Sequence, residues 1–224
     1  MPPACSQQTL VDRVYPDYLS ALLAGRRQQC LALVSELMDA DVPLKTIYLD
    51  LFERSMYQVG ELWESNRISV ATEHIATAIT ENAMGLLHPV IFASEHCGRK
   101  AIISCVANEY HQIGGKMVAD IFELHGWDGY FLGANTPIHD LLSMIAEKKP
   151  DLVSLSLTMF SNIPELLRHL ATLRENCPGL PVIVGGQAFR WGGAFQVEGL
   201  PKVRLLRSID ELESLIANFP MGLQ

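Results

Sequence analysis

The stretch Ala101-Ile102-Ile103-Ser104-Cys105-Val106, followed by Asn108-Glu109-Tyr110-His111-Gln112-Ile113-Gly114-Gly115, decides the fold. The first part is an apolar run that predicts a buried strand, and a helical pattern over residues 116–125 follows the second. A strand, a glycine-containing loop and a helix form the first unit of a doubly wound sheet, whose ligands lie at the carboxyl ends of the strands. His111 falls at that edge. Glu109 can accept one imidazole N–H, which directs the other ring nitrogen toward a metal.

Strands and helices alternate through the rest of this region. We predict strands at about 100–106, 129–132, 151–157, 181–184 and 203–206, and helices at about 114–125, 138–148, 164–176, 190–196 and 209–218. This order predicts a right-handed, parallel sheet. Helical periodicity over 9–23, 26–40, 44–62 and 70–87 predicts a four-helix bundle before it. The expected fold class is α + α/β, with a helical cap domain at 9–89 and a Rossmann-like (flavodoxin-like) five-stranded parallel sheet domain at 99–220.

Composition argues against several classes of protein. The formal net charge is −8, and no basic cluster exceeds Gly25-Arg26-Arg27, so we expect no direct binding to nucleic acid. No run of about 18 apolar residues predicts a membrane span. The five cysteines are scattered without a Cys-x-x-Cys motif, and the N-terminal residues lack a signal-peptide pattern. These features predict a cytoplasmic protein with structural thiols.

Two further motifs follow predicted strands. Ser156 and Thr158 end the third strand, where hydroxyl groups can bond a ligand or only the local backbone. Gly185 and Gly186 end the fourth, where they leave room for a flat ligand or form a simple turn. Together with His111 they bracket a slot at one edge of the sheet. A long ligand with a metal at one end would fit such a slot.

The helical region carries a fourth motif. Trp63 ends one predicted helix, and Glu73 and His74 open the next. This spacing can place an indole, a carboxylate and an imidazole on one surface, although a core Trp with a solvated Glu-His pair is the alternative. Trp127, Phe189 and Trp191 are expected in the core or in a contact between the domains.

With these motifs, the chain resembles cobalamin-binding proteins of the methionine-synthase type over about residues 9–218. Those proteins carry Asp-x-His-x-x-Gly, then Ser-x-Leu, then Gly-Gly. This chain carries Glu109-x-His111-x-x-Gly114, then Ser156-x-Thr158, then Gly185-Gly186. The resemblance implies that His111 is the lower axial ligand of cobalt in place of the cofactor's dimethylbenzimidazole, and that Glu109 tunes it. It also implies that Ser156 bonds the displaced base and that the two glycines let it pass.

The helical motif Trp-x9-Glu-His is similar to that of CarH-type and AerR-type light-sensing cobalamin proteins. That resemblance implies that Trp63, Glu73 and His74 cover the upper axial face, where an adenosyl group sits until light cleaves the Co–C bond. CarH-type regulators have an N-terminal DNA-binding domain, whereas this chain starts directly with the cap. We therefore expect output through a protein partner, such as a transcription regulator, or through a homo-oligomer.

The expected function is thus a non-enzymatic cobalamin-binding photoreceptor that holds adenosylcobalamin. One alternative is a corrinoid carrier that hands a methyl group from methylcobalamin to separate enzymes. Another is a photoreceptor that also binds a bilin, biliverdin, near His88, His96 and Cys97. No catalytic triad, phosphate-binding loop or zinc-ligand spacing is recognisable.

Overall fold

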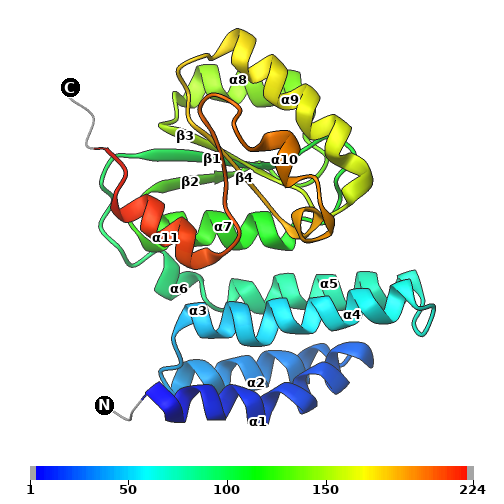
Figure 1. Cartoon of the computed structure of the whole chain (residues 1–224). Coiled ribbons are helices and arrows are strands. Elements are labelled where there is room, and N and C mark those ends of the chain that lie inside the picture. The colour runs from blue at the N-terminus through cyan, green and yellow to red at the C-terminus, as the bar shows by residue number, and fades with distance from the viewer. Residues whose placement is uncertain (1–3, 221–224) are drawn as a thin grey trace. The chain divides into compact units, whose positions relative to one another are not determined.

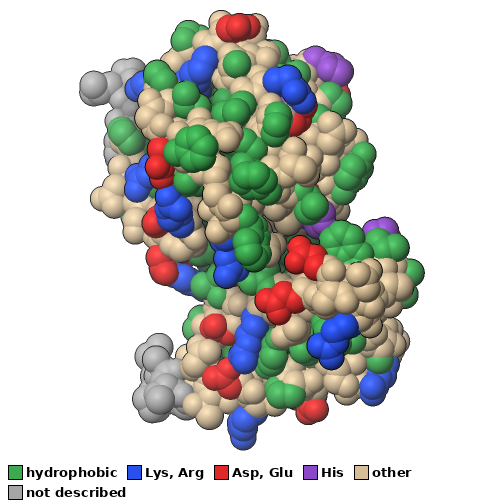
Figure 2. Space-filling model, turned by 45° about the vertical axis from the view of Figure 1, so that its right-hand side comes forward, with side chains coloured by type: hydrophobic (Ala, Val, Ile, Leu, Met, Phe, Trp, Pro, Cys, Tyr) green, Lys and Arg blue, Asp and Glu red, His purple; other side chains and the backbone are tan. Residues whose placement is uncertain are grey.

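The computed structural model describes residues 4–220, with side chains from residue 7 onward, and the chain divides into two compact units between Val90 and Ile91 (Figure 1). The first unit is helical, and the second contains the sheet. No helix of the described part is long and apolar enough to span a membrane. Acidic and basic side chains are interspersed on the face seen in Figure 2.

The first unit is built from the four predicted helices. They are α1 (Ala4–Leu23), α2 (Arg27–Asp39), the continuous run of α3 (Leu44–Thr46), η1 (Ile47–Glu53) and α4 (Arg54–Glu64), and α5 (Val70–Gly85), with a short α6 (His88–Ile91) after them. α1 begins five residues before the start predicted from periodicity. Ser69 caps α5 by accepting the Thr72 N–H at 3.1 Å. The fully buried Tyr18 and Phe52 bring α1 and η1 together, with ring centroids 6.1 Å apart.

η1 is a π-helical segment that periodicity did not predict. The Arg54 N–H reaches back to the carbonyl of Leu49, five residues earlier, as well as to that of Leu51. A π segment of this kind adds a residue to the turn without ending the helix. The apolar pattern of residues 44–62 still reads as one helix, because the added residue shifts the pattern only locally.

The second unit is a parallel five-stranded sheet in the order β2-β1-β3-β4-β5. Its strands are β1 (Lys100–Cys105), β2 (Asp128–Phe131), β3 (Leu152–Ser156), β4 (Val182–Gly185) and β5 (Val203–Leu205). The helices are α7 (Ile113–Leu124), α8 (Ile138–Lys148), η2 (Phe160–Asn162), α9 (Ile163–Asn176), η3 (Gln187–Trp191), α10 (Ala194–Val197) and α11 (Ile209–Ala217). Figure 1 shows α7 and α11 on one face of the sheet and α8 and α9 on the other. This architecture confirms the predicted fold class. The single helix expected at 190–196 is instead a 3₁₀ turn followed by one short helix.

Strand register determines which loops meet at the carboxyl edge. Cys105 pairs with Ser156, and Ser156 pairs with Gly185, so β1, β3 and β4 end at the same level. The residues that lead up to these ends, such as Ile103 and Leu155, are buried, because helices cover both faces of a parallel sheet. The loops after these three strands are therefore neighbours in space.

Candidate functional site

The loop between β1 and α7 holds Glu109 against His111. The fully buried Glu109 accepts the His111 Nδ1–H at Oε1 over 2.6 Å, and the same oxygen accepts the His111 backbone N–H at 3.0 Å. A carboxylate can only accept, so a ring proton lies on Nδ1, and Nε2 is the ring nitrogen that can serve as a metal ligand. The His111 side chain is 40% exposed. This loop can therefore present a metal-ligating nitrogen at the carboxyl edge of the sheet.

The other oxygen of Glu109 is bound by the loop that follows β3. Glu109 Oε2 accepts the backbone N–H groups of Thr158 at 3.0 Å and Met159 at 2.9 Å, and Asn162 Nδ2 lies 3.4 Å away. Burial raises the pKa of Glu109, but the hydrogen bonds from His111, Met159 and Thr158 outweigh it and lower that pKa to about 2. Glu109 is thus an anion at neutral pH. Thr158 donates to Glu109 through its backbone N–H. This hydrogen bond is therefore the same whether position 158 carries Thr, as here, or the Leu of the family motif.

Three asparagines that sequence reasoning missed tie the loops together. Asn108 has a φ of 66°, a left-handed conformation that Asn tolerates better than most residues. Its N–H donates to Asn135 Oδ1 at 2.7 Å, and its carbonyl accepts from Asn162 Nδ2 at 3.0 Å. The Asn135 N–H donates to the Glu109 carbonyl at 2.8 Å. An asparagine soon after each of β1, β2 and β3 is the signal that could have revealed this network.

Ser156 and Gly114 lie close together at this edge. A Cβ at Gly114 would be 3.9 Å from Ser156 Oγ, and one at Gly115 would be 3.4 Å from Ser156 Cβ. Ser156 is buried, and its hydroxyl faces the start of α7, where Gly114 has no side chain. The structure thus brings the first two motifs together, with the Ser156 hydroxyl beside the glycines that open α7.

Gly185 and Gly186 meet neighbouring backbone. Gly186 has a φ of 117°, and a Cβ there would lie 2.2 Å from the Leu157 carbonyl oxygen. A Cβ at Gly185 would lie 3.1 Å from the Leu206 carbonyl oxygen. Close approach of the backbone therefore requires Gly186 independently of any ligand. A role for the two glycines in admitting a ligand stays a prediction.

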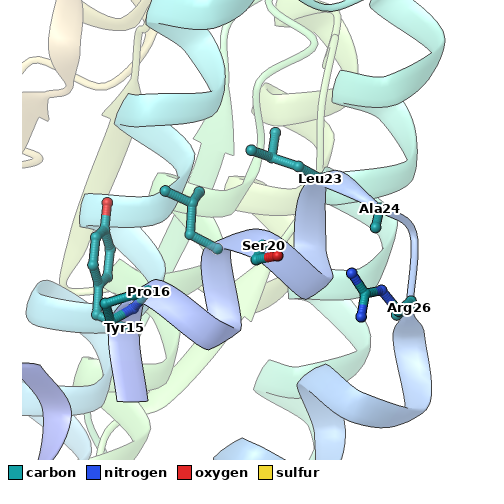
Figure 3. A pocket seen from close by; sticks show the side chains of 7 residues that line it. Tyr15, Pro16, Ser20, Leu23, Ala24 and Arg26 are labelled. Atoms are coloured by element: carbon teal, nitrogen blue, oxygen red, sulfur yellow. The ribbon is translucent and has the colours of Figure 1, made fainter. Parts of the chain in front are cut away.

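The helical unit brings Glu73 and His74 together in the first turn of α5. The mostly buried Glu73 accepts the Thr77 hydroxyl at 2.8 Å, and the exposed His74 has Nε2 3.6 Å from Glu73 Oε2. Trp63 is half-buried, one residue before the end of α4. A surface pocket on this unit lies elsewhere, and its lining contains none of these three side chains. Residues 15, 16, 19, 20, 23, 24 and 26 line that pocket, most of them on α1 (Figure 3).

The remaining candidates have simpler surroundings. Trp127 and Phe189 are buried as expected, whereas Trp191 is 72% exposed on η3, so the expectation of a core position for it was wrong. His96 Nδ1 lies 2.6 Å from Asp128 Oδ1, which ties the linker to β2, and Cys97 beside it is exposed. Among the described residues, no group of three or more His, Cys, Asp and Glu side chains could hold a bare metal ion.

Comparison with known proteins identifies the family. Residues 99–198 match the family described as B12 binding domain, and residues 15–88 match a second family with the same description. The chain therefore carries two B12 binding domains, a helical one and a Rossmann-like one. This finding confirms the resemblance drawn from the motifs.

Individual relatives agree with this assignment. The HTH-type transcriptional repressor CarH of Myxococcus xanthus is 29% identical over 174 residues, which are 77% of this chain and 57% of CarH. The repressor CarA of the same organism is 30% identical over 125 residues, 55% of this chain and 43% of CarA. The chain thus spans about half the length of these curated relatives. The monomethylamine corrinoid protein of Methanosarcina barkeri has the same fold, with a TM-score of 0.77 over 91% of this chain and 97% of its own, at 18% identity.

Proposed function

We propose that this chain is a cytoplasmic, non-catalytic regulator that binds cobalamin with His111 as the lower ligand of cobalt and senses light through that cofactor. Cobalt ligation by His111 rests on the 2.6 Å contact between ionised Glu109 and His111 Nδ1. It fits cobalt ligation, because it fixes the orientation of the ring and makes Nε2, the nitrogen remote from Glu109, the one that would bind a metal. The Ser156 hydroxyl beside Gly114 would hydrogen-bond the tail of such a cofactor.

The cofactor-binding residues of the second unit are then Glu109, His111, Gly114 and Ser156, with Thr158 acting through its backbone. His111 would bind cobalt through Nε2, while its Nδ1–H donates to the Glu109 carboxylate. The buried anion raises the basicity of the imidazole, which strengthens its bond to cobalt. We include Gly185 and Gly186 in the path of the displaced base, in addition to their role in backbone packing.

Light sensing rests on Trp63, Glu73 and His74 of the helical unit. Bound adenosylcobalamin supplies a Co–C bond that light breaks. Trp63 offers a half-exposed indole against which an adenosyl group can pack, and Glu73 offers carboxylate oxygens for its hydroxyl or amine groups. The Thr77 hydroxyl holds Glu73 in place, which supports a binding role for this carboxylate. Trp63 would lose this packing contact if the adenosyl group left, and such a local packing change can bias a larger conformational change.

The relatives support a regulatory output. CarH and CarA, with which this chain shares 29% and 30% identity over the matched residues, are HTH-type transcriptional repressors. We therefore propose that the cofactor state reaches a protein partner, such as a transcription regulator, or changes self-association of this chain.

A corrinoid methyl carrier is the second candidate. The fold likeness to the monomethylamine corrinoid protein, which extends over nearly the whole chain, favours it. In that case methylcobalamin is the bound form, and His111 has the same role. The two candidates differ in the helical unit, because a carrier has no need for a site that recognises an adenosyl group.

Spectroscopy of the reconstituted protein separates these functions. The protein is loaded with adenosylcobalamin in the dark, and its absorption spectrum and size-exclusion profile are recorded before and after green light. Photolysis within seconds with a change in size or in partner binding supports the light sensor. Slow photolysis like that of free cofactor, with no change in size, favours the methyl carrier, and methyl transfer to a thiol would establish it. Red or far-red absorption of the purified protein would indicate the bilin alternative, and failure to bind cobalamin would refute both main candidates.

A further inference from the structure

The surface pocket along α1, which we call the α1 groove, is not part of the proposed cobalamin site. Its volume is about 670 Å³, and its lining includes Tyr15, Leu19 and Leu23 (Figure 3). These three apolar side chains recur every four residues along one side of the helix, and the helical unit leaves them only half-buried. Ser20 and Ala24 lie beside them with side chains too short to fill the groove. A hollow apolar strip that a folded chain leaves open is typical of a surface that binds another protein.

The Tyr15 end of the α1 groove is fixed by an ion pair. The guanidinium carbon of Arg54 lies 3.8 Å from the centre of the Tyr15 ring, and Arg54 Nη1 donates to Asp12 Oδ1 at 2.8 Å. Arg54 of α4 thus holds the ring in place on α1. A side chain that is fixed before its partner arrives loses less conformational entropy on binding.

The α1 groove has an acidic group toward one end and a basic group at the other. The exposed Asp17 is seven residues before Ala24, a spacing that places both on the same side of α1. Arg26 lines the opposite end. The Gly25 turn, with a φ of 68°, folds Arg26 against the last turn of α1, where its N–H donates to the Ala21 carbonyl at 2.8 Å. Both charges therefore flank the apolar strip at fixed places.

We infer that the α1 groove binds the α1 groove of a second copy of this chain, with the two helices antiparallel. The register that brings Asp17 opposite Arg26 of the second copy also pairs large side chains with small ones, Leu19 with Ala24 and Leu23 with Ser20. A twofold axis beside residues 21 and 22 generates each of these pairs twice, as an interface between identical surfaces requires. Shape and charge are thus complementary in one register.

The charges also select the direction of the second helix. In a parallel pair, Asp17 would face Asp17 and Arg26 would face Arg26, and such like charges repel. The antiparallel contact needs no cobalamin, so the inference goes beyond the proposed function. One pair of helix faces is smaller than the interfaces of about 1,600 Å² in stable complexes. We therefore expect a weak dimer that dissociates on dilution.

Charge reversal and mixing test this arrangement in the full-length protein. Asp17→Arg and Arg26→Asp each bring like charges together at two symmetry-related places, so each should raise the dimer Kd at least about tenfold in sedimentation velocity. An equimolar mixture of the two variants should dimerise again, because every charged pair in the mixed dimer joins an arginine to an aspartate. The control is Asp140→Arg on α8, where the side chain is 60% exposed, and its Kd should stay within about twofold of wild type. Far-UV circular dichroism checks that each variant is folded.

Each outcome supports or overturns the antiparallel pair. Recovery of the dimer in the mixture, with both single variants weakened, supports it. Single variants that dimerise like wild type, or a mixture that does not recover, overturn it. Wild-type protein that is monomeric at every concentration also overturns it, and the α1 groove would then suit a helix of another protein. The proposed function is tested separately, by whether the wild type binds cobalamin and responds to light.

Discussion

Replacing Glu109 with Gln tests whether the buried carboxylate stabilises the second unit through its charge. Its pKa is about 2 in the folded protein, compared with an ordinary value of 4.5. A carboxylate whose pKa is lower in the folded than in the unfolded state stabilises the fold at pH values above its ordinary pKa. That stabilisation is lost as the pH falls toward the pKa of the folded state. The difference between these two pKa values contributes about 3 kcal/mol to the free energy of unfolding at pH 7 and about half of that at pH 3.

We therefore expect Glu109→Gln to lower the free energy of unfolding by about 2–3 kcal/mol at pH 7, because a neutral amide replaces an anion that accepts several N–H groups. The difference in free energy of unfolding between wild type and variant should fall by about half at pH 3. Urea unfolding, followed by tryptophan fluorescence, measures this difference. Both proteins carry Trp63→Phe, so that the two remaining tryptophans report on the second unit. Following one unit also avoids treating a two-unit chain as two-state.

Glu147→Gln is the control for this experiment. Glu147 is exposed on α8 and paired only with the neighbouring Lys148 at 2.8 Å, so the same loss of charge should change stability by less than about 0.5 kcal/mol. The reasoning is refuted if Glu109→Gln costs no more than this control at pH 7. It is also refuted if the cost at pH 3 equals that at pH 7, because the loss would then reflect shape and not ionisation.

Three other substitutions test separate parts of the site. His111→Ala should leave far-UV circular dichroism unchanged and remove the histidine-ligated spectrum of bound cobalamin; retention of that spectrum would identify another ligand. Gly186→Ala should destabilise the second unit by more than about 2 kcal/mol in thermal unfolding, since its Cβ would lie 2.2 Å from the Leu157 carbonyl oxygen. The control Gly179→Ala should change stability very little, because a Cβ there would have nothing within 4 Å. Asn162→Ala removes two hydrogen bonds to the loop after β1 and should cost about 1–2 kcal/mol in the same assay, and a change below 0.5 kcal/mol would argue against its linking role.

Much of the fold was predictable, because apolar periodicity records which faces are buried. The five strands and the main helices lie within a few residues of their predicted positions, and Ser69 correctly marked the start of α5. The π segment at residues 47–53 was not predictable, since one added residue leaves the apolar spacing of a long helix nearly unchanged. The core alternative for Trp191 was wrong, because composition alone cannot distinguish a core tryptophan from one on an exposed turn, and the alternative of a contact between domains stays a prediction.

The candidate site was predictable only in its local part. The pair Glu109 and His111 is two residues apart, so sequence spacing alone could suggest their contact. The motifs after β3 and β4 could be placed at the same edge, because parallel strands end together. The requirement for glycine at 186 could not be seen, since it depends on the carbonyl of Leu157, which follows the neighbouring strand β3.

The hydrogen bonds to the second oxygen of Glu109 explain why the Glu-x-His spacing alone does not fix the orientation of His111. A carboxylate held only by its own loop could rotate, and His111 would rotate with it. Backbone N–H groups about 50 residues later in the chain bind Oε2 and prevent this rotation. The orientation of His111 thus depends on the pairing of β1 with β3, which carries the loop after β3 to Glu109. A Glu-x-His pair in an isolated loop would lack this support. The same chemical pattern acquires a fixed ligand geometry here because the parallel sheet supplies the remaining hydrogen-bond donors.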